Sequence, residues 1–147
     1  MKLLRVGDDR FKHALGFTII RFKVSSEDTN GGLLIIEHSN LTRGGPPRHL
    51  HHDQEEWFYV LQGEVLIEIG GETTTLKAGD SVLAPREVPH AWAYVSESPG
   101  GMLIGFAPAG KMEAFFRAVT GAEHIPQDAK LLSDHGMELV GPPLLQP

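Results

Sequence analysis

Residues 44–63 read GGPPRHLHHDQEEWFYVLQG and hold the pattern that determines the fold. Glu56 opens an aromatic and β-branched run, residues 56–61, which predicts a β-strand. Successive residues of a strand point to opposite faces, so His49 and His51 share one face of the strand before it. A short turn between the two strands brings the carboxylate of Glu56 beside both imidazoles.

A fourth side chain of the same chemistry follows later in the chain. Residues 79–90 read GDSVLAPREVPH and lead into an expected strand over residues 88–95, which carries His90. His90 reaches the earlier residues only if this strand returns to pair beside the first one, which requires a closed or rolled sheet. The sequence therefore predicts one cluster inside such a sheet, made of His49, His51, Glu56 and His90.

Three imidazoles and one carboxylate form a ligand set for a single divalent transition metal. Such a set suits iron, manganese, nickel, copper or zinc and suits calcium or magnesium poorly. The chain has no cysteine, which excludes iron–sulfur clusters, thiolate ligands and disulfides. The alternative is that these histidines lie on the surface and that Glu56 belongs to an acidic loop with Asp53 and Glu55.

With these two segments the chain resembles the cupin superfamily, whose first motif has the HxH pair, a following Glu and a closing Gly. The short gap between Gly63 and Gly79 is typical of single-barrel members, and the resemblance implies that His49, His51, Glu56 and His90 hold a metal. The chain departs from the motifs at three positions, none of them a ligand: Arg43 and Glu87 stand where the family has Gly, and Tyr94 where it has Asn. We expect Glu87 to be accommodated with a negative φ.

The remaining pattern is that of an all-β protein. Short strands are expected over residues 17–24, 33–37, 65–69, 73–76 and 102–107, with glycine-rich turns between them. This spacing predicts a double-sheet roll, and the resemblance implies the cupin version of it, a double-stranded β-helix or jelly-roll barrel.

Two short helices are predicted after the barrel. Apolar residues recur at helical spacing after Pro108, which predicts a first helix that closes near Gly121. Pro126 and Gly136 bracket a second over residues 127–135. We therefore expect one cupin domain over residues 1–147, with a barrel core at about 14–108, a helical segment at about 109–136 and an extended or disordered tail at 137–147.

Strand alternation also predicts the wall of a substrate pocket. Phe58 and Val60 share a face with Glu56, and Trp92 and Tyr94 share one with His90. An apolar and aromatic wall of this kind favours a flat aromatic or enolisable ligand over a sugar phosphate, which needs cationic partners. His38 fits equally a core position or one behind the ligands, and the other histidines are expected to face solvent: His13, His52, His124 and His135.

Charge and length limit the partners. The net charge of −6 without a basic cluster argues against nucleic acid and against anionic membranes. No apolar stretch approaches the roughly 18 residues of a membrane helix, so we expect a cytoplasmic protein that binds a small molecule. The resemblance implies a homodimer, which would bury the outward Trp57, Tyr59 and Leu61, unless the C-terminal helix covers them instead.

The resemblance is strongest to quercetinase-like single-barrel cupins. It implies a metal-dependent dioxygenase of a flavonol, catechol-like or diketone substrate, in which Glu56 is also the catalytic base that takes the hydroxyl proton of the substrate. Two alternatives stay open. One is a cupin that binds a small molecule without catalysis, and the other is a metal-dependent isomerase or hydrolase, which zinc as the native ion would favour.

Overall fold

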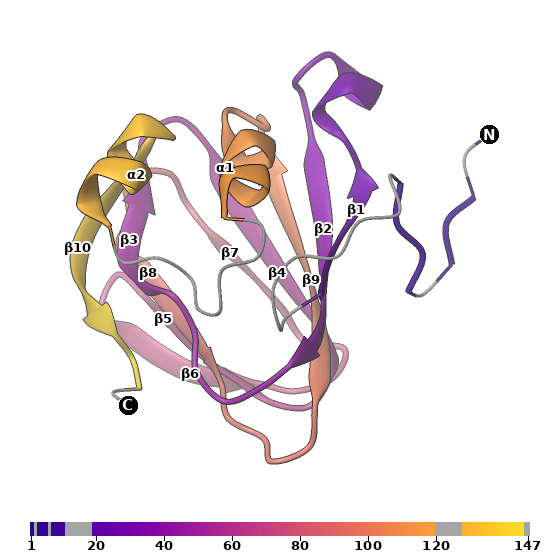
Figure 1. Cartoon of the computed structure of the whole chain (residues 1–147). Helices are drawn as coiled ribbons and strands as arrows, with labels where there is room; N and C mark the ends of the chain where they lie inside the picture. The colour runs from indigo at the N-terminus through magenta and orange to yellow at the C-terminus, as the bar shows by residue number, and fades with distance from the viewer. Residues whose placement is uncertain (2, 6, 11–18, 120–127, 146–147) are drawn as a thin grey trace.

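Two antiparallel sheets of five strands face each other in the computed structural model and enclose the core (Figure 1). The structure describes all residues except 2, 6, 11–18, 120–127 and 146–147. The first sheet has the order β1 (Ile19–Val24), β2 (Leu34–Leu41), β9 (Gly100–Ala107), β4 (Glu55–Gln62) and β7 (Ser81–Ala84). The second has the order β10 (Met137–Pro143), β3 (Pro47–His51), β8 (His90–Tyr94), β5 (Val65–Ile69) and β6 (Glu72–Leu76). The predicted all-β jelly roll is confirmed.

Alternation along the strands decides which side chains face the core. In β4, Glu56, Phe58 and Val60 are buried, while Trp57 and Tyr59 between them are half-buried on the outer face. Side chains from both sheets meet in one apolar cluster, as expected when two half-apolar sheets pack together. Glu56 thus lies on the core side of its strand. The homodimer expected through the outer face of β4 stays a prediction.

Two short helices lie at one end of the barrel, between the edges of the sheets (Figure 1). The helix α1 (Met112–Ala118) buries Met112, Phe115 and Phe116, which confirms the predicted apolar stripe. The helix α2 (Ala129–Asp134) begins at Asp128, whose side chain accepts hydrogen bonds from the first backbone N–H groups. Within the described residues, no helix is long and apolar enough to span a membrane.

Several helix and strand ends in the structure differ from the predicted ends by a few residues. The helix α1 stops at Ala118, and Gly121, where its end was expected, lies outside the described residues. Residues 17 and 18 of the first predicted strand, the start of the barrel core near residue 14 and Pro126 also lie outside them. The assignment of residues 1–147 to one domain stays a prediction.

The expectation of a tail over residues 137–147 is corrected by β10. Met137–Pro143 pairs antiparallel with β3, with Met137 opposite His51 and Leu139 opposite His49. The sequence of this segment ends in Gly141, Pro142 and Pro143, which argue against a central strand. However, β10 is an edge strand with register shifts around Gly141. An edge strand tolerates proline because its outer side has no neighbouring strand to which a backbone N–H must donate.

Glu87 does not keep the negative φ expected from its sequence. Its φ is +66°, in the left-handed region, where glycine is the ordinary residue. The backbone N–H of Glu87 donates to the carbonyl of His51 at 2.7 Å, so this turn is tied directly to the end of β3. The chain thus holds an L-residue in a strained conformation beside a predicted ligand.

We predict that Glu87→Gly stabilises the protein. The left-handed conformation costs an L-residue about 1–2 kcal/mol, and glycine loses roughly 0.5–1 kcal/mol more backbone entropy on folding, which leaves a net gain of about 0.5–1 kcal/mol. The exposed pair of Glu87 with His52 at 3.2 Å contributes little. Urea unfolding measures the change. Glu72→Gly in β6, an exposed strand position, is the matched control and should destabilise; a loss of stability in both variants would contradict the strain argument.

Candidate metal centre

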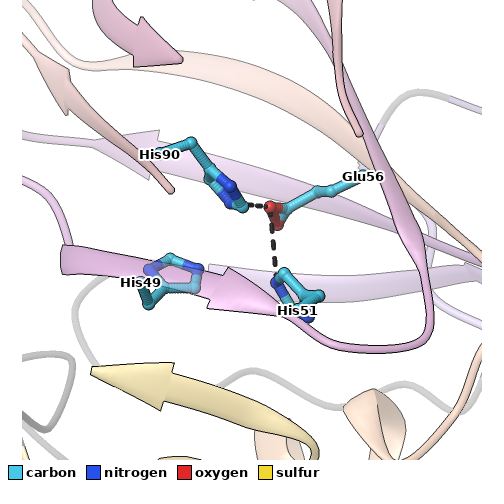
Figure 2. A group of neighbouring side chains, drawn as sticks. All are labelled: His49, His51, Glu56 and His90. Carbon is cyan, nitrogen blue, oxygen red and sulfur yellow. Dashed lines mark hydrogen bonds and ion pairs between the residues drawn. The ribbon is translucent and has the colours of Figure 1, made fainter. Parts of the chain in front are cut away.

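The four predicted ligands come together at the end of the barrel beside the helices. His49 and His51 lie on β3, Glu56 near the start of β4 and His90 at the start of β8, where His49 pairs with His90. All four residues are buried, and one ligating atom of each lies within 4.8 Å of the others (Figure 2). Two of the strands belong to one sheet and the third to the other, so the cluster bridges the two layers.

Each imidazole is held through the nitrogen that faces away from the cluster. The three Nδ1 atoms donate to oxygen atoms that can only accept: His49 to the carbonyl of Pro47 at 2.8 Å, His51 to Oε1 of Gln54 at 3.0 Å, and His90 to the carbonyl of Val88 at 3.3 Å. These bonds place the proton on Nδ1. Nε2 is thereby the metal-binding atom of each imidazole, and in His90 it must first give up the proton that it shares with Glu56.

One carboxylate oxygen lies at the centre of the group. Oε2 of Glu56 is 2.7 Å from Nε2 of His90 and 3.6 Å from Nε2 of His51 (Figure 2). Burial alone would raise the pKa of Glu56, but the charge of His90 and the nearby His51 outweigh burial and hold that pKa far below its usual range. Burial lowers the pKa of His90, and the Glu56 carboxylate more than reverses this, so the net shift is upward. The carboxylate is therefore charged.

The donor set fits a divalent transition metal. Ligands on opposite sides of such an ion, with bonds of about 2.0–2.2 Å, lie up to roughly 4.4 Å apart, close to the 4.8 Å limit of the cluster. Nε2 of His51 is buried without a hydrogen-bond partner among the described residues. Burial and the charge of His90 lower the pKa of His49 to about 4, so its lone pair is free near neutral pH. Iron, manganese, nickel, copper and zinc all accept these ligands.

A small apolar cavity of about 40 Å³ lies beside the ligands and opens to solvent. His49 and Glu56 contribute to its wall. The rest is largely apolar and comes mainly from the strands and the two helices: Pro46, Pro47, Trp92, Ile104, Phe106, Met112, Phe115, Phe116, Leu132 and Met137, together with His38. The helices thus form one side of the cavity.

The four predicted pocket residues lie at different depths. Trp92 lines the cavity, whereas Phe58, Val60 and Tyr94 are buried in the core below it. The hydroxyl of Tyr94 donates to the carbonyl of Ser98 at 2.7 Å, away from the ligands. Alternation identified the inner face of each strand, but Phe58, Val60 and Tyr94 lie further along their strands, beyond the cavity wall.

The remaining histidines separate into two groups. His38, for which two positions stayed open, is buried in the cavity wall. His52 is exposed beside Glu87 and Glu138, and His135 is half-buried, with Nδ1 donating to the carbonyl of Leu131 at 2.8 Å. His13 and His124 lie outside the described residues.

Sequence reasoning missed Gln54, which orients a ligand. Its Oε1 accepts from His51, and its Nε2 donates to the carbonyl of Pro108 at 2.9 Å, so the amide bridges β3 to the end of β9. The side chain is buried, although it lies in a turn with exposed neighbours on one side. No spacing rule singles out a glutamine in such a turn, because its role depends on where Pro108 lies in space.

Comparison with known proteins agrees with this site. A family model described as a cupin domain matches residues 41–105, which include all four ligands. The chain is 27% identical over 82 residues to polyketide synthase CurC of Streptomyces cyaneus, covering 56% of this chain and 53% of that protein. It is 24% identical over 104 residues to quercetin 2,3-dioxygenase of Bacillus subtilis, covering 71% and 30%. The chain thus spans about half or less of the length of these curated relatives.

A solved structure shares the fold. The cupin domain of Cnp3 from Schizosaccharomyces pombe superimposes with a TM-score of 0.58 over 78% of this chain and 76% of that one. The two are 14% identical, so the likeness concerns the fold alone.

We predict that Gln54→Leu weakens metal binding about tenfold to a hundredfold, because residues that orient a ligand from behind have effects of that size. Competition with a chromophoric chelator for Zn²⁺ measures the affinity. Gln62→Leu, the same change at an exposed position near the far end of β4, should leave it unaltered. Equal affinities in the two variants would rule out the orienting role of Gln54.

We also predict that metal binding releases a proton at mildly acid pH. The raised pKa of His90 means that its pair with Glu56 stabilises the metal-free fold below about pH 6.5, and that this contribution is lost as the pH rises through the folded pKa. A metal must displace this proton, so about one proton per ion should appear at pH 6 and less at pH 9. Calorimetry in buffers of different ionisation enthalpy counts the protons. A release independent of pH would contradict the assignment.

Proposed function

Since residues 41–105 match a cupin domain, we propose that this chain is a metal-dependent dioxygenase of a small aromatic or enolisable substrate. The class covers flavonols, catechol-like compounds and diketones. One observation carries the proposal: Glu56 belongs both to the metal-binding cluster and to the wall of an apolar cavity. A substrate in that cavity meets the metal and a charged carboxylate together.

The cavity wall supports the substrate class. Aromatic and aliphatic side chains from both helices and from β8 and β9 surround it, and no lysine or arginine is among the described residues that line it. A phosphorylated or otherwise anionic ligand would lack a cationic partner there apart from the metal. A flat ring with oxygen atoms at one edge fits such a wall, with the oxygen edge toward His49 and Glu56.

The relatives point in the same direction. Quercetin, the flavonol in the name of one relative, joins aromatic rings to a hydroxyl and carbonyl pair that can chelate a metal. The other relative, CurC, is named as a polyketide synthase, and polyketides are rich in enolisable carbonyl groups. Both names therefore support a substrate that presents an enol or enolate to the metal.

The residues have separate tasks in this proposal. His49, His51, Glu56 and His90 hold the ion, which when bound supplies Lewis acidity and, if redox-active, chemistry with dioxygen. Glu56 takes the hydroxyl proton of the substrate on a carboxylate oxygen, since it lines the cavity and belongs to the metal-binding cluster. Phe115 and Phe116 on α1 exclude water from the reacting edge.

The experiment loads the metal-free protein with iron, manganese, nickel, copper or zinc and follows oxygen consumption with quercetin, catechol and 2,4-pentanedione. At least one redox-active metal should give oxygen uptake in proportion to substrate loss. The His49→Ala, His90→Ala double variant, which loses two ligands, is the blank. A protein that holds only zinc and consumes no oxygen would favour an isomerase or hydrolase, and one that retains no metal would favour a binding module.

We predict that Glu56→Gln lowers oxygen uptake at least about a hundredfold, because it removes the base as well as a charged ligand. Metal content measured beside activity separates the two losses. Glu55→Gln is the matched control: the adjacent Glu55 is bound to Arg86 at 2.7 Å outside the cavity, and its loss should leave activity within about twofold. Full activity in Glu56→Gln would show that Glu56 is not the base.

A further inference from the structure

His38 is a buried imidazole in the cavity that the metal ligands do not account for. It lies on the inner face of β2, with only 2% of its surface exposed, and lines the same cavity as His49 and Glu56. Its ring packs edge-on against Trp92 at 5.6 Å and Phe116 at 6.4 Å between ring centres. Its Nδ1 has no hydrogen-bond partner within the described part of the chain.

A buried imidazole with an unpaired nitrogen in a cavity wall calls for a polar partner. Buried polar groups are nearly always hydrogen-bonded, because burial removes their contacts with water. The other inward positions of the strand, Leu34 and Ile36, are apolar, so a leucine would continue the pattern at position 38. The imidazole is the exception, and within the described residues its Nδ1 makes no hydrogen bond although the indole of Trp92 packs edge-on nearby.

The protonation state of His38 suits a hydrogen bond to a neutral ligand. Burial lowers its pKa to about 4, although the charge of Glu56 acts in the opposite direction. Near neutral pH the ring is therefore uncharged, with one N–H donor and one lone pair. It can serve a hydroxyl or a carbonyl but adds no charge to the cavity.

His38 lies away from the ligands along the sheet. The strand β9 separates β2 from β4, so these two strands lie two strand spacings, about 9–10 Å, apart. Along β9, His38 pairs with Met102 and Glu56 with Phe106, four residues apart. A molecule that touches both the metal ligands and His38 must extend beyond a single small chelating group.

We propose that His38 is a specificity-determining residue, which hydrogen-bonds a second oxygen of the substrate while the first oxygen is held at the metal centre. The inference rests on the proposed function and narrows its substrate class to extended molecules with a polar group at each end and an apolar ring between. Trp92 and Phe116 pack against His38 and would flank that ring. A site built to bind a hydroxyl rejects analogues that lack it, because its own polar group is then left unpaired.

The test compares two flavonols on zinc-loaded protein, since zinc binds oxygen ligands without redox turnover. Quercetin and 3-hydroxyflavone share the chelating 3-hydroxy-4-keto pair, but only quercetin has hydroxyls elsewhere on its rings. Calorimetry should show tighter binding of quercetin to the wild type. His38→Phe should weaken quercetin about tenfold and change 3-hydroxyflavone less than twofold, and His38→Gln, which keeps a donor and an acceptor, should recover part of the loss.

Controls separate this role from a structural one. His52→Phe, at an exposed position outside the cavity, should leave both affinities unchanged. Zinc content and thermal unfolding are measured for every variant, and His38→Leu replaces His38→Phe if the larger ring prevents folding. In the wild type, the ¹⁵N signal of the His38 ring should shift on adding quercetin and not on adding 3-hydroxyflavone.

The outcomes distinguish the role of His38 from the proposed function. Equal losses for both flavonols in His38→Phe, or no change for either, would overturn the role of His38 and leave the proposed function standing. A zinc-loaded wild type that binds neither flavonol, with no shift of the His38 signal, would overturn the flavonol reading of the function together with the role of His38.

Discussion

The structure of the site depends on one buried charge, the carboxylate of Glu56. A charged group removed from water is unstable unless it is paired, and the partner at 2.7 Å is Nε2 of His90. Glu56 comes from one sheet and His90 from the other, so the pair forms only when the two layers close on each other. Closure of the barrel and assembly of the ligands are therefore one event, and a bound metal would tie the same two layers together.

The surroundings of Glu56 and His90 strengthen their electrostatic interaction and hold the imidazoles in place. The cavity beside it is walled by apolar side chains, where electrostatic interactions are stronger than in water. The imidazoles are held from behind by the carbonyls of Pro47 and Val88 and by Gln54. Rigid ligands and an apolar, aromatic wall are the conditions under which a metal and a carboxylate can act on one substrate together.

Three of the four predicted ligands follow from local rules, whereas His90 joins them only through the closure of the sheet. Alternation puts His49 and His51 on one face, and the spacing to Glu56 is that of a short turn. Depth was not predictable: Phe58 and Tyr94 share a face with a ligand and still lie below the cavity. Gln54 and His38 depend on what lies opposite them, Pro108 in one case and Trp92 in the other, and no local pattern carries that information. The strand β10 was hidden by prolines that only an edge position permits.

The pairing of β3 has a consequence for how the site forms. The ladder between β3 and β8 records one pair, His49 with His90, whereas β10 runs along β3 from Met137 opposite His51 to Pro143 opposite Pro47. The strand that carries two ligands is therefore aligned mainly by residues far downstream of it. Until β10 has paired, the two histidines are present but their strand lacks its main partner. Loss of the β10 pairing would therefore misplace two of the four predicted ligands at once, although β10 itself supplies none of them.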